Sequence, residues 1–585
     1  MPLRPSPARP PLSRNSGRRA LSAGLLALLM ATPFPAAADD PSSYAASGAY
    51  LAARQAMGDQ NFAVATPFLD RVLEVLPDDS QLMENLLVAR MALGDLQGAL
   101  EPAERLRGHD SQAGRLVRLA ALMVEDDHET VLEALDEGEG LGALFDPLLR
   151  GWTLIALGRM SDGLVAFEEV GRLSGMEVFG HYHTALALAS AGDAEGAEAI
   201  LSGQAFGPLQ LTRRGFEARA QVLSQLDRNA EAEVLLAETF GEDPELAQLR
   251  AAVATGEPLP FAIVTQPRDG MAEVFFDIAG ALYGDAADAF TLTLSRVAEA
   301  LRPDHVPARL LSAQMLGGMG QYDLAVAAYS TVPSDSPGFV IAEIGRAEAL
   351  HRTGEAEAAQ EVLEALADSH SQFAVVHVTL GDLLRRERQF DAASRAYDSA
   401  LDLLGEPLPQ HWSIHFSRAI THEREGRWPE AEADFRMALE LNPDQPQVLN
   451  YLGYSLVERR ENLDEALEMI RRAVEAEPNS GYIIDSLGWV YYRLGRYDEA
   501  LTYMERAVEL LPTDAILNDH LGDVFWALGR KREARFQWQR ARSLGPADDL
   551  DMDRIRRKLD IGLDAVLVDE GTEPHHPVTE ARRGH

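Results

Sequence analysis

The chain has 585 residues, of which 92 are acidic, 53 are lysine or arginine and none is cysteine, so its formal net charge is −39. An acidic excess of this size makes nucleic acids and anionic lipid surfaces poor partners and favours basic or neutral polypeptides. Without cysteine the sequence excludes disulfides, thiolate metal sites and cysteine nucleophiles, and we expect no direct lipid anchor at a signal-cleavage site.

Residues 1–38 have the organisation of a secretory signal peptide. Arginines precede an apolar run over residues 21–31, and small residues follow as far as Ala38. The run is too short to span a bilayer but suits a cleaved signal. We therefore expect a periplasmic protein, cleaved between Ala38 and Asp39. Two adjacent arginines ahead of the run leave twin-arginine export open beside the general secretory route.

A degenerate helical repeat is predicted over residues 39–254. Turn-forming residues recur there every 32 to 36 positions, at Gly58, Gly94, Asp126, Gly158, Gly192 and Asp227. Apolar residues between these turns fall at the spacing of paired helices. Residues 255–270 then carry several Pro and Gly, which break helices. This stretch is predicted to be a linker between two segments or a long loop packed against one continuous array.

The regular part of the chain covers residues 271–546. One set of residues recurs after 34 positions: Gly488, Tyr491, Gly495, Ala500, Met504, Ala507 and Pro512 become Gly522, Phe525, Gly529, Ala534, Trp538, Ala541 and Pro546. Small residues are needed where two helices cross closely, and Pro ends the second helix. This pattern is typical of the tetratricopeptide repeat (TPR), which has two antiparallel helices in each unit. We predict an all-α, right-handed TPR superhelix of about 14 helical hairpins.

The C-terminal end of the array is predicted to be capped. Over residues 547–569, apolar side chains recur at helical spacing, at Leu550, Ile555, Leu559 and Leu563. A solenoid needs such a helix to cover the apolar face of its last repeat. Residues 570–585 are polar without periodicity and are predicted to be a disordered tail.

The first helix of each unit lines the concave groove of a TPR superhelix, which makes its groove-facing side chains candidate protein-binding residues. In the last three full units these include Asn450, Tyr454, Asp485, Trp489, Tyr492, Asn518, Asp519, Asp523 and Trp526. Carboxylates and amides can hold a peptide backbone or basic side chains, and aromatic rings supply contact area at low entropy cost. For Trp489 and Trp526, packing between adjacent helices is the alternative interpretation.

The sequence contains no recognisable catalytic, cofactor or metal pattern. His422 and Glu423 lack the second histidine of a zinc-protease helix, and there is no glycine-rich phosphate loop or nucleophile elbow. We therefore expect a protein without enzymatic activity, cofactor or metal.

Two strings are more specific than the general repeat pattern: Asp-Ser-Leu-Gly-Trp at 485–489 and Asn-Asp-His-Leu-Gly-Asp at 518–523. They resemble a group of exported TPR proteins of Gram-negative bacteria. The resemblance covers roughly residues 270–565. Relatives in this group are outer-membrane TPR lipoproteins that act as adaptors for a periplasmic carboxyl-terminal-processing serine protease. The resemblance implies binding to that protease and to its clients, notably peptidoglycan hydrolases. This chain departs from those relatives because it has no lipidation cysteine.

These observations predict a periplasmic protein-binding scaffold that presents protein substrates to a protease or another envelope enzyme. The alternative is a structural TPR subunit of an envelope polysaccharide-export or outer-membrane assembly machine, which would bind a fixed partner and no protease.

Overall fold

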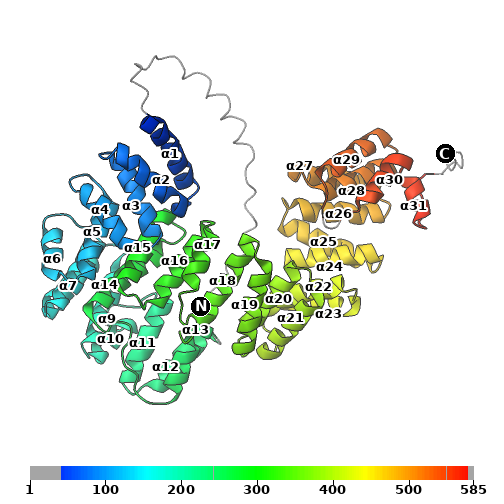
Figure 1. The fold of residues 1–585 in the computed structure, drawn as a ribbon. Coiled ribbons are helices and arrows are strands. Elements are labelled where there is room, and N and C mark those ends of the chain that lie inside the picture. Colours follow the sequence, from blue (N-terminus) through cyan, green and yellow to red (C-terminus); the bar gives the residue numbers. More distant parts are fainter. Residues whose placement is uncertain (1–40, 242, 548–549, 577–585) are drawn as a thin grey trace. The chain divides into compact units, whose positions relative to one another are not determined.

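The computed structural model describes residues 41–241, 243–547 and 550–576; the predicted signal peptide lies outside these ranges. Over them the chain forms 31 α-helices and no strand, which confirms the predicted all-α class of stacked helical hairpins (Figure 1). None of the described helices combines the length and apolar character needed to cross a bilayer. The chain divides into two compact units, residues 1–376 and 377–585.

The described part of the first unit consists of helices joined by short turns. Its helices are α1 (Pro41–Gly58), α2 (Phe62–Val75), α3 (Ser80–Ala92), α4 (Leu96–Arg105), α5 (Gln112–Val124), α6 (His128–Asp136), α7 (Phe145–Ala156), α8 (Met160–Val170), α9 (Glu177–Ser190), α10 (Ala194–Leu201), α11 (Arg213–Gln225), α12 (Asn229–Phe240), α13 (Pro244–Ala254), α14 (Pro267–Leu282), α15 (Asp288–Leu301), α16 (Val306–Gly318), α17 (Tyr322–Tyr329), α18 (Phe339–Thr353) and α19 (Ala356–Ser369).

The second unit continues the same pattern of paired helices. Its helices are α20 (Ala374–Arg386), which begins just before the division, α21 (Phe390–Leu404), the 3-10 helix η2 (Pro409–His411), α22 (Trp412–Arg424), α23 (Trp428–Leu441), α24 (Pro446–Arg459), α25 (Leu463–Ala476), α26 (Gly481–Arg493), α27 (Tyr497–Leu510), α28 (Ala515–Ala527), α29 (Lys531–Leu544), α30 (Met552–Ile561) and α31 (Leu563–Asp569).

Tight turns join the paired helices, and each such turn contains at least one residue with a positive φ. Gly495 and Gly529, which follow α26 and α28, have φ values of 75° and 76°. Glycine adopts this region without steric cost. Asp126, Asp227 and Arg388 hold the corresponding position with φ values of 57°, 58° and 61°. The turns therefore form even where the glycine of the repeat signature is absent.

The helices of each hairpin approach closely at the small residues of the repeat pattern. A Cβ atom on Gly488 would lie 2.9 Å from the side chain of Met504, and one on Gly522 would lie 2.4 Å from the ring of Trp538. Other residues of these two repeats, including the leucine before each glycine, are at most 5% exposed: Leu487, Tyr491, Ala500, Ala507, Leu521, Phe525, Ala534 and Ala541. Burial of this hydrophobic set stabilises the stack of hairpins.

In the first unit, helices distant in sequence pack together. Helix α14 contacts α7 and α9, and α15 contacts α3 and α5 (Figure 1). Gly270 of α14 lies against Trp152 of α7, and the Arg268 guanidinium donates to the Val124 carbonyl oxygen at 3.0 Å. The α14–α15 hairpin thus packs against the first helices of the early repeats, an arrangement that the repeat pattern does not predict.

The chain between α13 and α14, residues 255–266, lies within the first unit. Ile263 and Val264 are buried, and the Arg302 guanidinium donates to the Ile263 carbonyl oxygen at 2.6 Å. The Gln221 side chain accepts a hydrogen bond from the Ala262 amide at 2.8 Å. These contacts fix the loop against helices on both sides of it.

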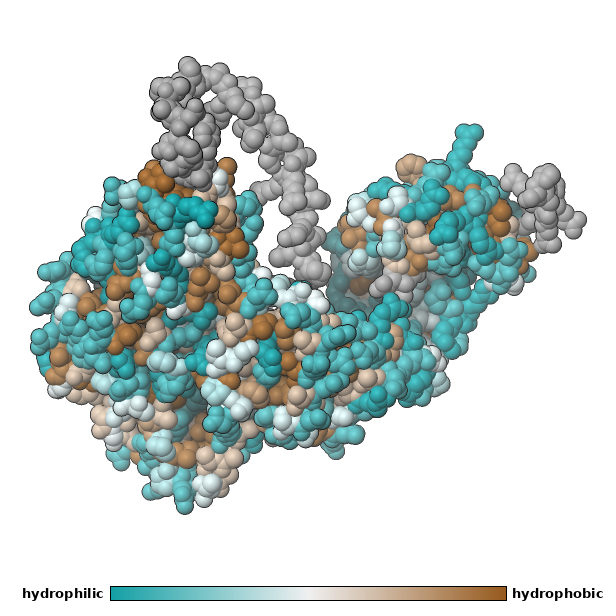
Figure 2. Space-filling model, in the orientation of Figure 1, coloured by the Kyte–Doolittle hydropathy of each residue, from teal (hydrophilic) through white to brown (hydrophobic). Residues whose placement is uncertain are grey.

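The C-terminal end differs from the expectation in two respects. The capping segment forms two helices, α30 and α31, because Gly562 between them has a φ of 86°. Residues 570–576 pack against the array, so the predicted disorder is wrong for them: His575 lies within hydrogen-bonding distance of two tyrosine hydroxyls. The rest of the predicted tail, 577–585, lies outside the described residues. Elsewhere, hydrophilic side chains cover most of the visible face of each unit (Figure 2).

We predict that the close contact of α14 with α7 is sensitive to a single methyl group. An added Cβ on Gly270 would lie 2.3 Å from the Trp152 ring, so Gly270→Ala should lower the free energy of unfolding by about 1–3 kcal/mol through overpacking. Thermal unfolding followed by circular dichroism measures the loss.

Gly280 on the same helix provides the control, because a Cβ there would meet no atom within 4 Å. Gly280→Ala should therefore be neutral or stabilise by about 0.5–1 kcal/mol. Equal effects of the two substitutions would contradict this account of the contact.

Candidate functional site

The nine predicted binding residues lie on three helices of the second unit: α24, α26 and α28. Helix α26 contacts both of the others. We call the surface that they form the C-terminal face: Asn450 and Tyr454 on α24, Asp485, Trp489 and Tyr492 on α26, and Asn518, Asp519, Asp523 and Trp526 on α28. The two residues on α24 are partly exposed, whereas the seven on α26 and α28 are at most 8% exposed. The structure therefore brings the predicted residues together but buries most of them.

A buried lysine from α30 covers the carboxylates of α28. The Lys558 ammonium donates to Asp519 and Asp523, each at 2.8 Å, and its side chain is fully buried. Asp523 also accepts a hydrogen bond from the Trp538 indole at 2.8 Å. Burial raises the pKa of Asp519, although the Lys558 charge opposes this. The two carboxylates are thus engaged within the chain.

The aromatic residues of the face are engaged by the segment that follows. The Trp526 indole donates to Asp564 of α31 at 2.9 Å. The His575 ring lies between two hydroxyls, 2.7 Å from Tyr492 and 2.9 Å from Tyr497. Burial lowers the pKa of His575 and raises that of Tyr492. Part of the predicted groove is therefore occupied by residues 552–576 of the same chain.

The remaining side chains of α26 and α28 support one another. Trp489 stacks on the His520 ring, with centroids 4.0 Å apart, and its indole donates to Glu458. His520 Nδ1 lies 2.9 Å from an Asp485 oxygen. The Asn518 side chain donates to the Asp514 carbonyl at 2.6 Å, within its own helix. Trp489 thus packs between the first helices of adjacent repeats, as in the alternative interpretation, whereas Trp526 packs against Trp538 of α29 and the C-terminal cap.

The sequence contains a signal for this arrangement that the repeat pattern does not use. Lysine occurs only at positions 531 and 558, whereas arginine supplies the other basic side chains. Lys558 falls between Ile555 and Leu559 on the apolar face of the capping helix. Because a buried lysine requires a carboxylate partner, its position indicates that acidic side chains lie opposite.

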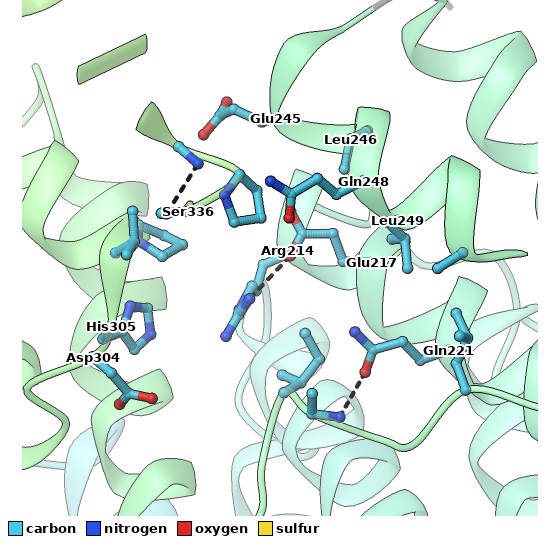
Figure 3. A pocket seen from close by; sticks show the side chains of 18 of the residues that line it. Arg214, Glu217, Gln221, Glu245, Leu246, Gln248, Leu249, Asp304, His305 and Ser336 are labelled. Atoms are coloured by element: carbon cyan, nitrogen blue, oxygen red, sulfur yellow. Dashed lines mark hydrogen bonds and ion pairs between the residues drawn. The ribbon is translucent and has the colours of Figure 1, made fainter. Parts of the chain in front are cut away.

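The first unit contains two cavities that sequence analysis did not predict. Cavity A, of about 470 Å³, lies between α11, α13 and the start of α16; Figure 3 shows Arg214, Glu217 and Gln248 facing His305 and Ser336 across it. Cavity B, of about 410 Å³, lies between α9, α11 and α14. Both are lined by Arg214, Glu217, Glu245 and Pro307.

A buried ion network forms the wall behind these cavities. The Arg214 guanidinium bonds to Glu273 at 2.9 Å and to Glu217 at 3.0 Å, and His305 Nε2 lies 3.1 Å from Glu273. Burial opposes the charged form of Glu273, but Arg214 and His305 outweigh it and lower the Glu273 pKa. Burial and the Glu273 charge raise the pKa of Asp277, one helical turn along α14. The available sequence signal was that Glu273 and Asp277 lie within the mostly apolar stretch of α14 that follows Asp269.

Among the described residues, no group of three or more His, Asp or Glu side chains is arranged to hold a metal ion.

Tetratricopeptide-repeat family models match the C-terminal part of the chain. One model matches residues 310–372, 378–446 and 486–549, and a second matches residues 444–513. Together with the stacked helical hairpins, these matches show that residues 310–372 and 378–549 consist of tetratricopeptide repeats. Repeats of this class build extended concave surfaces on which other proteins bind.

Two curated relatives share part of this region. The TPR repeat-containing protein PA4667 of Pseudomonas aeruginosa is 26% identical over 159 residues, which cover 27% of this chain and 26% of the relative. The lipoprotein NlpI homolog of Haemophilus influenzae is 36% identical over 86 residues, or 14% of this chain and 27% of the relative. The chain thus spans about a quarter of the length of each relative.

Solved structures resemble the chain only distantly. The Cut9 and Hcn1 assembly of APC/C covers 88% of this chain and 96% of its own, at 15% identity and a TM-score of 0.37. YrrB, described as a TPR protein with an unusual peptide-binding site, covers 32% and 94%, at 21% identity and a TM-score of 0.26. Likenesses this weak have no bearing on function.

We predict that the buried lysine holds the C-terminal cap in place. Lys558→Met would leave Asp519 and Asp523 buried without a full counter-charge, which should cost about 3–5 kcal/mol. Five of the six tryptophans lie in the second unit, so urea unfolding followed by tryptophan fluorescence reports on it. Arg556→Met on the same helix is the control; its ion pair with Asp553 is exposed, so the change should cost less than about 1 kcal/mol. Similar small losses for both variants would contradict the buried triad.

We also predict that the second unit loses stability as the pH rises above 6.5. Burial opposes the charged form of His520, but Asp485, Asp519 and Asp523 raise its pKa above the usual 6.5. Its stabilising contribution is therefore complete below pH 6.5 and is lost as the pH rises through the raised value. The free energy of unfolding, measured against pH, should decline above pH 6.5 and should decline less steeply in His520→Gln. Parallel curves for the two proteins would argue against this assignment.

Proposed function

We propose that the protein is a non-catalytic, protein-binding scaffold of the periplasm that brings protein partners together. The observation that carries this proposal is the array of tetratricopeptide repeats matched between residues 310 and 549. Such an array offers several separate surfaces along one chain, so two partners bound to it are held at a high effective concentration. Export with cleavage between Ala38 and Asp39 belongs to the same proposal.

The chemistry of the C-terminal face supports polypeptide binding. Its carboxylates hold a lysine, and its tyrosine hydroxyls hold a histidine, both from residues 552–576 of the same chain. The side chains of the face that are partly exposed, and so accessible to a partner, are the amide of Asn450 and the phenol of Tyr454.

The partners that we propose are a periplasmic carboxyl-terminal-processing protease and its cell-wall hydrolase clients. Support comes from the strings at 485–489 and 518–523 and from the likeness to a lipoprotein homolog over 86 residues. The sequence contains no cysteine, so this proposal does not include the lipid anchor of the related lipoproteins.

The proposal predicts that the chain accelerates proteolysis without being a protease. The purified protease and a peptidoglycan hydrolase are mixed at concentrations below the dissociation constant of their direct complex. Substoichiometric amounts of the chain should then raise the rate of hydrolase loss by at least about tenfold. Gel electrophoresis over time measures this rate. A large excess of the chain should slow proteolysis again, because protease and client then occupy different scaffold molecules.

The controls separate delivery from other effects. The chain alone should leave the hydrolase intact, and a general unfolded substrate should be degraded at an unchanged rate. If the chain leaves the rate unchanged and instead forms a stable stoichiometric complex with an export or outer-membrane assembly component, the adaptor proposal fails. That result would favour the structural subunit instead.

A further inference from the structure

Cavities A and B are adjacent in the first unit and share part of their walls. The Arg214–Glu217 ion pair, with Glu245 and Pro307, lines both. Their volumes, about 470 and 410 Å³, are each within the range of binding pockets that hold a ligand group. We call the two cavities together the unit-1 groove. An extended chain lying across the shared wall could place side chains into both cavities.

Both cavities offer apolar walls to such side chains. Cavity B is lined by Val178, Phe179, Leu211, Phe276, Ala281 and Pro307. Cavity A is lined by Leu246, Leu249, Leu259, Ile263, Val306 and Pro337, among others. Apolar walls with a few polar groups are the usual composition of a site that binds by burial and orients its ligand by hydrogen bonds.

The arginines of the groove are already paired with carboxylates. Arg213 bonds to Asp243 at 2.7 Å, and Arg302 bonds to Asp304 at 3.2 Å. Arg214 is held between Glu217 and Glu273, as described above. Each of these arginines is therefore in an ion pair, and acidic side chains outnumber the arginines around the groove.

Asp277 is the acid of the groove that lacks a cation; burial and the Glu273 charge raise its pKa, and an ammonium group entering the cavity would favour its charged form. Its side chain is 5% exposed and lines cavity B, and its Oδ2 atom has no hydrogen-bond partner among the described residues. The nearest ionisable nitrogen is His183 Nε2 at 3.6 Å, but burial lowers the His183 pKa to about 3, so this ring is neutral. The Tyr182 hydroxyl, which also lines cavity B, likewise has no partner within the described ranges.

We propose that the unit-1 groove binds an extended segment of a partner polypeptide. A lysine side chain of that segment enters cavity B toward Asp277 and Tyr182, and the apolar residues that flank the lysine occupy the walls of both cavities. This inference rests on the proposed scaffold function and assigns one of its binding surfaces. The net charge of −39 favours the approach of a basic segment.

Peptide binding to the purified full chain tests this assignment. The probe is a fluorescein-labelled decapeptide of alanine and leucine with one central lysine; its match carries norleucine, which has the same aliphatic stem without the charge. Fluorescence anisotropy should give a dissociation constant at least tenfold lower for the lysine peptide. Asp277→Asn should remove this preference and leave the affinity for the norleucine peptide unchanged.

A second variant tests the location. Gly280 lines cavity B, and a Cβ there meets open space, so Gly280→Leu should fill the cavity and weaken both peptides at least tenfold while the melting temperature stays unchanged. Gly318→Leu is the matched control, because Gly318 is exposed, also has open space around its Cβ, and does not line the groove.

Equal affinities for the two peptides, no binding of either, or full binding by Gly280→Leu would each overturn the assignment. The proteolysis assay separates this failure from failure of the scaffold function. If Gly280→Leu still delivers the hydrolase, the groove is wrong but the scaffold stands. If the lysine peptide binds as expected and the chain has no effect on proteolysis, the delivery function is wrong.

Discussion

The close approach of two helices at a residue with little or no side chain is the contact on which both units depend. At Gly488 and Gly522 this contact sets the distance between the helices of a hairpin. At Gly270 the same kind of contact allows α14 to lie directly on the Trp152 ring. Because packed interiors adjust little to added volume, these positions decide how the hairpins stack and where the α14–α15 hairpin lies. The helices themselves would form with many other residues there.

The sequence predicted the parts of the structure that repeat. A period of 34 residues carries the turn, the small contact residue and the core positions, so the helical hairpins follow from local pattern alone. The positions of α14 and α15 could not be predicted in this way, since their contacts with α3, α5, α7 and α9 join residues far apart in sequence. Periodicity predicts contacts between successive repeats, but it does not predict that a hairpin packs against earlier repeats.

The sequence predicted that the nine candidate residues share one face but not that most of them are buried; binding of a partner by this face stays a prediction. The nine residues lie together on three adjacent helices because the spacing from the turn glycine fixes which side chains share a face. That the chain's own end covers part of this face depends on Lys558, Asp564 and His575, which lie beyond the last repeat and obey no repeat pattern. The unit-1 groove was missed for a related reason: its walls come from α9, α11, α13, α14 and α16, which lie far apart in the sequence and are brought together only by tertiary packing.

The different contact patterns of the two units have a consequence for how the chain folds. The second unit is built mostly from neighbouring helices, so its structure can grow one hairpin at a time as the chain emerges. In the first unit α15 must contact α3 and α5, which closes a loop that contains most of that unit. The entropy cost of this closure precedes the stabilising contacts. The N-terminal hairpins, although made first, therefore expose apolar surface until α14 and α15 arrive, and we expect the first unit to be the slower of the two to fold and the more dependent on chaperones.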